Sequence, residues 1–284
     1  MKRFPDYSLC IRAHDNAVKH GFWDRERDYI EDFFENLLEE FEEAREILES
    51  GERSVDEVYY TEQKDGSKKL EGVPTELADI IILILDYIGG QNIDEETYNE
   101  LIKKSEKVRE EYRRNIQRVG IQNSEEVIFR EVMEECLNIM ARSMIKPMLL
   151  YNPRDMSAVE ITRINELLKI VQYMSVYAEY YGINVEERTI EKMEYNEKRP
   201  LKYKKGEQER TIGGKEINSR TLLIRKLSEI LVRMSADPNI DPEELKKIAK
   251  RIEEIAGKMA IGSLEGDTQR KTGGVSPGDD DGGR

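Results

Sequence analysis

At 284 residues, the chain is long enough to bury one sizeable apolar core or two smaller ones. Its formal net charge of −14 repels nucleic-acid phosphate and so disfavours DNA or RNA as a partner. The longest aliphatic run covers only residues 80–85, too short to cross a membrane, and the two cysteines lie in no metal-binding pattern. We therefore expect a cytoplasmic protein with neither a membrane nor a nucleic-acid partner.

The first half of the chain predicts helices almost throughout. Glu, Lys, Leu, Ile and Met recur at helical spacing, while Gly, Pro and clusters of β-branched residues are sparse, so we expect an all-α fold. Residues 52–72 are the exception and predict an exposed loop or hairpin. The expected helices are a short one that ends near Gly21, a long one over residues 27–49, a central one from Pro74 to Gly89, and a charged one over residues 94–117.

The next segment resembles the first one. Glu135, Glu166 and Val185 follow their counterparts Glu40, Glu76 and Ile93 by 95, 90 and 92 residues, and such near-constant offsets indicate a duplicated helical unit that packs as a pseudo-dimer. The second copy has lost its acids. Asn138 stands where the first copy has Glu43, Lys169 where it has Asp79, and Val176 where it has Asp86.

Beyond Pro200 the composition changes. A segment rich in Lys, Glu and Gly predicts a linker, two helices over residues 219–236 and 242–260 predict a hairpin, and the tail lacks any apolar pattern, so we expect it to be disordered. The predicted architecture is a helical bundle of four parts. They are a first unit (1–118), a degenerate second unit (119–206), a linker with a helical hairpin (207–262) and a tail (263–284).

Acidic residues interrupt the most apolar helix. Residues 80–85 cover every side of this helix, yet Glu76, Asp79 and Asp86 share one face of it. Buried carboxylates need basic partners or a cation. Glu40 and Glu43 form a second pair on the preceding helix, and two such pairs could surround a hard divalent cation, for which Mg²⁺ is the best candidate and Mn²⁺ the alternative. Because magnesium completes its shell with phosphate oxygens, a phosphorylated ligand is expected.

These residues resemble those of a known family, the all-α nucleoside triphosphate pyrophosphohydrolases that are MazG-like in the broad sense. The family pattern is EExxE followed by ExxD, which this chain matches with residues 39–43 and 76–79. His14, residues 19–24 and the segment from Lys192 through Tyr195-Asn196-Glu197-Lys198-Arg199-Pro200 are similar to phage and bacterial members. The 32 residues between Glu43 and Glu76 are more than usual for the family, and the YN-x-x-RP segment follows the second unit. If the units pair, the first lends carboxylates and the second lends cations.

The resemblance implies magnesium-dependent hydrolysis of a nucleoside triphosphate to a monophosphate and pyrophosphate. It also implies a role for each matching residue: Glu40, Glu43, Glu76 and Asp79 as magnesium ligands; Glu39 or Glu43 as the group that orients or deprotonates water; Lys192, Lys198 and Arg199 as phosphate contacts; Asn196 on sugar or phosphate; Trp23 or Phe22 on the base; and Asp86 beside the substrate.

Simpler interpretations remain open. A helix so rich in acids produces ExxE by chance, Glu76 suits the first turn of any helix, and Trp23 and Phe22 suit a core. No ExxH pair occurs, which argues against a ferritin-like di-iron bundle. The competing functions are a catalytically inert nucleotide-binding protein of the same fold and a helical adaptor that uses the C-terminal hairpin. Association of chains through helical packing is compatible with each.

Overall fold

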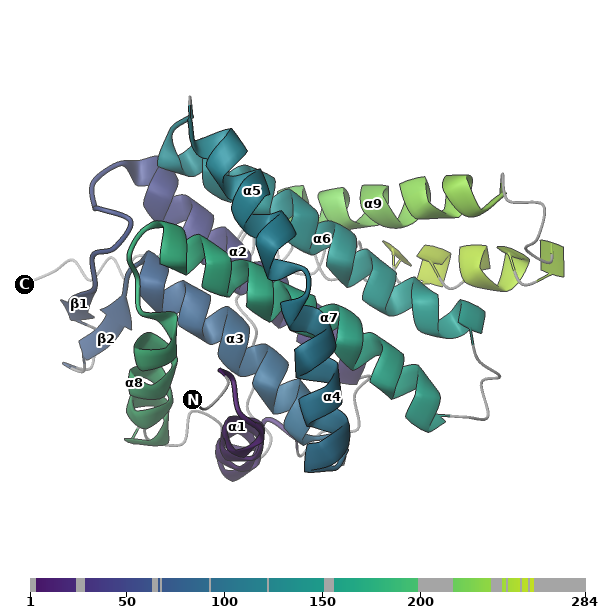
Figure 1. Ribbon diagram of the computed structural model, residues 1–284, viewed down its shortest axis with the longest axis horizontal. Helices are drawn as coiled ribbons and strands as arrows, with labels where there is room; N and C mark the ends of the chain where they lie inside the picture. The colour runs from purple at the N-terminus through teal and green to yellow at the C-terminus, as the bar shows by residue number, and fades with distance from the viewer. Residues whose placement is uncertain are drawn as a thin grey trace, which may run out of the picture.

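The chain folds into an all-α bundle with one small β-hairpin (Figure 1), as the sequence predicts. The computed structural model describes residues 4–23, 29–62, 66, 68–91, 93–121, 123–150, 156–198, 217–235 and 242–257, the last range without 244, 251 and 255. The predicted tail and most of the linker lie outside these residues, as does Arg199. No helix in the described part combines the length and apolar character that crossing a membrane requires.

The helices match the expected ranges closely, with one difference. The predicted charged helix over 94–117 is two helices, because Lys107 N–H and Val108 N–H bond to carbonyls three residues back and form a turn. This turn lets both pieces pack along the same neighbouring helix. The helices are α1 (Tyr7–Lys19), α2 (Tyr29–Ser50), α3 (Val73–Gly89), α4 (Glu95–Glu106), α5 (Arg109–Gly120), α6 (Glu125–Leu150), α7 (Met156–Tyr180), α8 (Val185–Lys198) and α9 (Ile217–Ser235).

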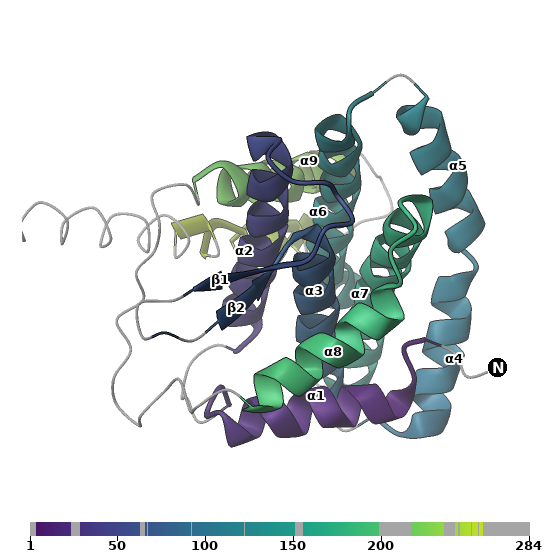
Figure 2. The same cartoon turned by 90° about the vertical axis from the view of Figure 1, so that its left-hand side faces the viewer.

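Residues 59–71 form an antiparallel hairpin of β1 (Tyr59–Glu62) and β2 (Lys68–Glu71), which pairs Thr61 with Lys69. The hairpin leads directly into α3 through Gly72. That glycine has a φ of 121°, and a side chain at this position would collide with the carbonyl of Glu57. The hairpin therefore lies at the N-terminal end of α3, beside the first turn of that helix (Figure 2).

The core is built from two pairs of helices, α2 with α3 and α6 with α7, which meet through α2–α6 and α3–α7 contacts. Phe34, Phe41, Ile80 and Leu168 are fully buried where these helices meet. Helix α3 lies in the middle, and its apolar run is buried on nearly every side, as the sequence predicts, apart from the half-buried Ile82 and Leu83. Apolar side chains of both predicted units belong to one contiguous cluster, so the units share a core.

In each half, the helix that follows the core pair crosses to the other half. Helix α4 follows α3 in sequence but packs on α7, whereas α8 follows α7 and packs on α3. The same exchange in both directions is the arrangement expected of a pseudo-dimer, although the origin of the halves by duplication stays a prediction. Helix α1 packs on α3 and α8 at one end of the bundle (Figure 2).

Helix α9 lies on the outer face of α6 and also touches α2. Leu223 and Leu227 are fully buried there, and the Lys226 ammonium binds the Glu134 carboxylate at 2.7 Å. The described residues between 242 and 257 are helical, in agreement with the predicted helix over residues 242–260, and Ile248 and Ile252 among them are buried.

Candidate metal and phosphate site

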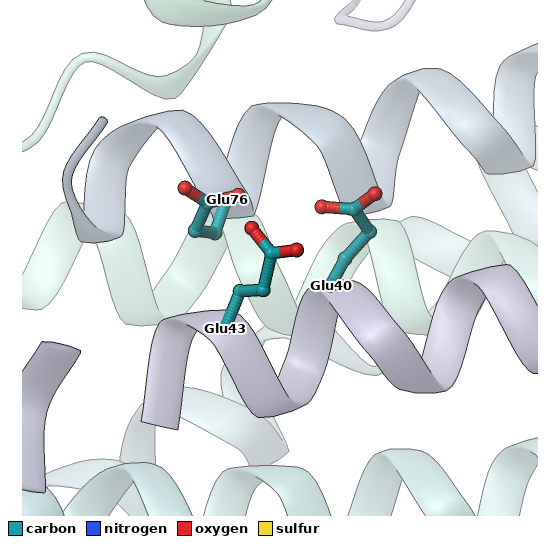
Figure 3. A group of neighbouring side chains, drawn as sticks. All are labelled: Glu40, Glu43 and Glu76. Carbon is teal, nitrogen blue, oxygen red and sulfur yellow. The ribbon is translucent and has the colours of Figure 1, made fainter. Parts of the chain in front are cut away.

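Three carboxylates from two helices converge at the N-terminal end of α3. Glu40 and Glu43 project from successive turns of α2 toward α3, where the side chain of Glu76 meets them (Figure 3). One oxygen from each of the three lies within 4.8 Å of the other two. Oxygens on opposite sides of an octahedral Mg²⁺ are about 4.2 Å apart, given ligand distances near 2.1 Å. The three acids are thus close to the spacing of a divalent-cation site.

The local sequence explains this convergence. On α2, Leu37, Phe41 and Ala44 are buried, so the helix turns this stripe inward and carries Glu40 and Glu43 along its edge. Pro74 occupies the first turn of α3, and Glu76 follows within the same turn, where the helix dipole favours an acid. Packing of α2 on α3 then brings the two pairs of turns together.

Glu76 is the most deeply buried of the three acids. Its side chain is 1% exposed, and its Oε1 has no hydrogen-bond partner among the described residues. Burial, followed by repulsion from Asp79 and Glu43, raises the pKa of Glu76 to about 8 against the attraction of Lys192 and Lys69. Burial and the same neighbouring acids also raise the pKa of Glu40 well above its usual range. A buried carboxylate oxygen without a donor is the feature that a bound cation would satisfy.

Asp79 is electrostatically part of this group but has a different partner. Its Oδ2 accepts from the Lys192 ammonium on α8 at 2.6 Å, and the Lys192 residue is only 3% exposed. Burial raises the pKa of Asp79, while Lys192 acts to lower it. The exchange of α8 onto α3 therefore brings a cation from the second predicted unit to an acid of the first, whereas the contact of Lys192 with phosphate stays a prediction.

A second lysine reaches the group from the hairpin. The Lys69 ammonium lies 3.3 Å from Glu43 Oε2 and 3.1 Å from Glu71 Oε1. Tyr195 on α8 donates its hydroxyl to the Lys68 carbonyl at 2.7 Å, which ties the hairpin to the helix that carries Lys192. The sequence predicts an exposed loop or hairpin for the Lys69 segment but not this contact. Only the alternation of residues along β2, with Leu70 buried, indicates which lysine faces the acids.

The group holds more acid than base. If every member is ionised, at least two negative charges lack compensation, which suits a divalent cation better than a further lysine. The members are Glu40, Glu43, Glu76, Asp79, Lys69 and Lys192.

The corresponding place in the second half is neutralised by side chains. Glu135 and Glu166 take the places of Glu40 and Glu76, and both bind the Arg142 guanidinium, at 3.2 and 3.6 Å. The Lys169 ammonium binds Glu166 at 2.7 Å. Asn138, in place of Glu43, donates to Glu135 at 3.3 Å. Two acids and two cations balance here, so this cluster does not require an added cation.

Asp86 lies apart from the carboxylates. It is seven residues beyond Asp79, about 10 Å along the helix. Its Oδ1 accepts from the Trp23 indole at 2.9 Å and lies 3.1 Å from His14 Nδ1, so it faces α1 instead of α2. A side chain on Gly90 would overlap the Trp23 ring. Asp86 and Trp23 are therefore hydrogen-bonded to each other, and contact of either with a substrate stays a prediction.

The remaining predicted residues flank the group. Glu39 is half-buried on α2 and is not one of the three converging acids. Asn196 on α8 is half-buried, and its Oδ1 has no partner in the described part of the chain. Lys198 is exposed at the end of α8. His20 is buried, with its Nδ1 2.8 Å from the Asn16 carbonyl oxygen.

Comparisons with known proteins add no evidence on this site. No family model, curated protein or solved structure matches this chain. What the site can do must therefore be argued from its own geometry and from the sequence pattern.

Proposed function

We propose that this protein is a Mg²⁺-dependent nucleoside triphosphate pyrophosphohydrolase, which converts a ribo- or deoxyribonucleoside triphosphate and water into a monophosphate and pyrophosphate. The observation that carries the proposal is the convergence of Glu40, Glu43 and Glu76, together with a buried Glu76 Oε1 that has no hydrogen-bond partner among the described residues. The likeness of residues 39–43 and 76–79 to the MazG-like EExxE and ExxD pattern supports the same reaction.

Glu40, Glu43 and Glu76, with Asp79 adjacent, are the residues that would hold Mg²⁺. The ion, when bound, offsets charge on phosphate oxygens and lowers the pKa of a bound water. The carboxylate geometry and the excess of negative charge fit this ion, and the same oxygen ligands accept Mn²⁺.

Other side chains supply the rest of the proposed chemistry. In the proposed reaction a water oxygen attacks the α-phosphorus, and the bond from this phosphorus to the α,β-bridging oxygen breaks. Glu43, whose side chain is 49% exposed, faces the solvent from which water and substrate arrive and is placed to take the proton of that water. Glu39, one turn earlier on the same helix, is the alternative base. Lys192 keeps Asp79 paired and, with Lys198 and Arg199, offers positive charge to the phosphates.

The proposed protein has one active site per chain, at the seam between its two helical units, and acts in the cytoplasm. Contacts between chains are not needed for this site, because α8 already brings the second unit's lysine to α3.

The test is pyrophosphate release from the eight common ribo- and deoxyribonucleoside triphosphates, with Mg²⁺ and with chelator. Glu40→Gln and Asp79→Asn are run beside the wild type, and Glu135→Gln, at the equivalent place in the neutral cluster, is the matched control. Metal-dependent release that is lost in the first two variants and kept in the control is expected. Release without metal, or equal loss in all three variants, contradicts the proposal. Mg²⁺-dependent nucleotide binding without release would favour the inert binding protein, and neither activity would favour the adaptor.

A further inference from the structure

The hairpin holds one lysine against the mouth of the carboxylate site. Lys69 reaches Glu43 at 3.3 Å, and its side chain is 32% exposed, so it lies where solvent meets the acids. The cation thus occupies the entrance on the side of the most exposed acid.

The backbone around Lys69 is fixed from three sides. Leu70 is 7% exposed and anchors the opposite face of β2, the Tyr195 hydroxyl holds the Lys68 carbonyl at 2.7 Å, and the tight turn at Gly72 fixes the exit into α3. Among the described residues, in contrast, the long side chain of Lys69 is held by two carboxylates at its charged end. The ammonium can therefore move between partners while the hairpin stays in place.

The two lysines of the site differ in availability. Lys192 is 3% exposed and forms a 2.6 Å contact with Asp79, whereas both contacts of Lys69 are longer and its side chain is open to solvent. A divalent cation on Glu43 would cancel the attraction that holds Lys69 there and repel its ammonium. The triphosphate, which must enter from the solvent side, offers the nearest alternative negative charge.

We propose that Lys69 binds the β- and γ-phosphates of the substrate, and hence the pyrophosphate product, and that in the metal-free protein it neutralises Glu43 instead. This inference rests on the proposed pyrophosphohydrolase function. Its chemistry is a single charge-assisted contact between an ammonium and phosphate oxygens, with no covalent step.

The experiment compares Lys69→Met with Lys69→Arg and with Lys68→Met, which alters the neighbouring exposed residue on the other face of β2. Steady-state kinetics at saturating Mg²⁺ give KM and kcat for the best substrate. Inhibition by pyrophosphate is measured beside inhibition by the nucleoside monophosphate, which lacks the β- and γ-phosphates. Thermal unfolding checks that each variant is folded.

Lys69→Met should weaken pyrophosphate inhibition and raise KM by about 10- to 100-fold, the loss of one charge-assisted contact, with little change in inhibition by the monophosphate. Lys69→Arg should keep most of the affinity for substrate and most of the inhibition by pyrophosphate, and Lys68→Met should match the wild type. If Lys69 is only a counterion for Glu43, its removal will leave pyrophosphate inhibition unchanged. That result overturns the inference alone, as does a Lys69→Met variant in which inhibition by pyrophosphate and inhibition by the monophosphate weaken equally. A wild type that releases no pyrophosphate overturns the proposed function as well.

Discussion

Replacing Glu76 by glutamine separates a metal site from a structural ion pair, because the two predict opposite changes in stability. In the metal-free protein Glu76 has a pKa of about 8, against 4.5 for an ordinary glutamate, because it is buried beside Asp79. Between pH 4.5 and 8 the folded state binds a proton that the unfolded state does not, so the stability contribution of Glu76 is lost as the pH rises through this window. At about 1.4 kcal/mol per pH unit, the cost at pH 7 is about 3 kcal/mol.

Glu76→Gln removes this cost, but it buries an amide, and this burial lowers the stability by roughly 1 kcal/mol. We expect the metal-free variant to be more stable than the wild type by about 2 kcal/mol, or about 4–8 °C in Tm for a chain of this size. Adding Mg²⁺ should raise the Tm of the wild type and leave that of the variant unchanged.

The assay is thermal unfolding at pH 7 in chelator and in a Mg²⁺ series, with Glu100→Gln as the control, since Glu100 is exposed on α4 and far along the chain from the site. A variant that is less stable than the wild type in chelator would show that Glu76 is held by a favourable ion pair, and the reasoning above would be wrong.

Three further outcomes are expected. Lys192→Met leaves buried Asp79 without its partner and should cost about 3–5 kcal/mol in chelator, with part of the loss recovered by Mg²⁺; denaturant titration measures both. Cys10 and Cys136 are free and fully buried, and burial raises the pKa of Cys10 to about 12, so neither should react with an alkylating reagent until the chain unfolds. Deleting residues 207–284 exposes the apolar face of α6 that α9 covers, so it should lower Tm by several degrees. Turnover at 20 °C should survive, because α9 carries no residue of the candidate site. A deletion variant that is folded but inactive would contradict this.

The acids of the candidate site could be found from the sequence because their signal is local. Glu76 and Asp79 interrupt an apolar helix, and helical spacing alone puts Glu40 and Glu43 on one edge of α2. The partners of these acids are less local, since the Lys192–Asp79 contact depends on α8 crossing to α3. The sequence indicated that crossing only through the order of the two repeated units.

Other features depend on tertiary packing and could not be read from the chain. Asp86 shares a helix face with Asp79, but it lies about 10 Å further along α3, where α1 packs on that helix. The turn at Lys107 contains no Gly or Pro, so nothing local marks it. Lys69 depended on the register of a hairpin whose loop length alone does not fix which residues face the bundle.

The crossing of α4 and α8 between the halves makes the site a shared property of the whole chain. Neither half holds a complete set of charged groups, since the acids lie on α2 and α3 while the buried lysine arrives on α8. A substitution in the core of α7, remote from the acids of the site, would weaken the packing that positions the start of α8 and so displace Lys192. The second half thus contributes Lys192 to the candidate site, although its own acids Glu135 and Glu166 are neutralised by cations of that half.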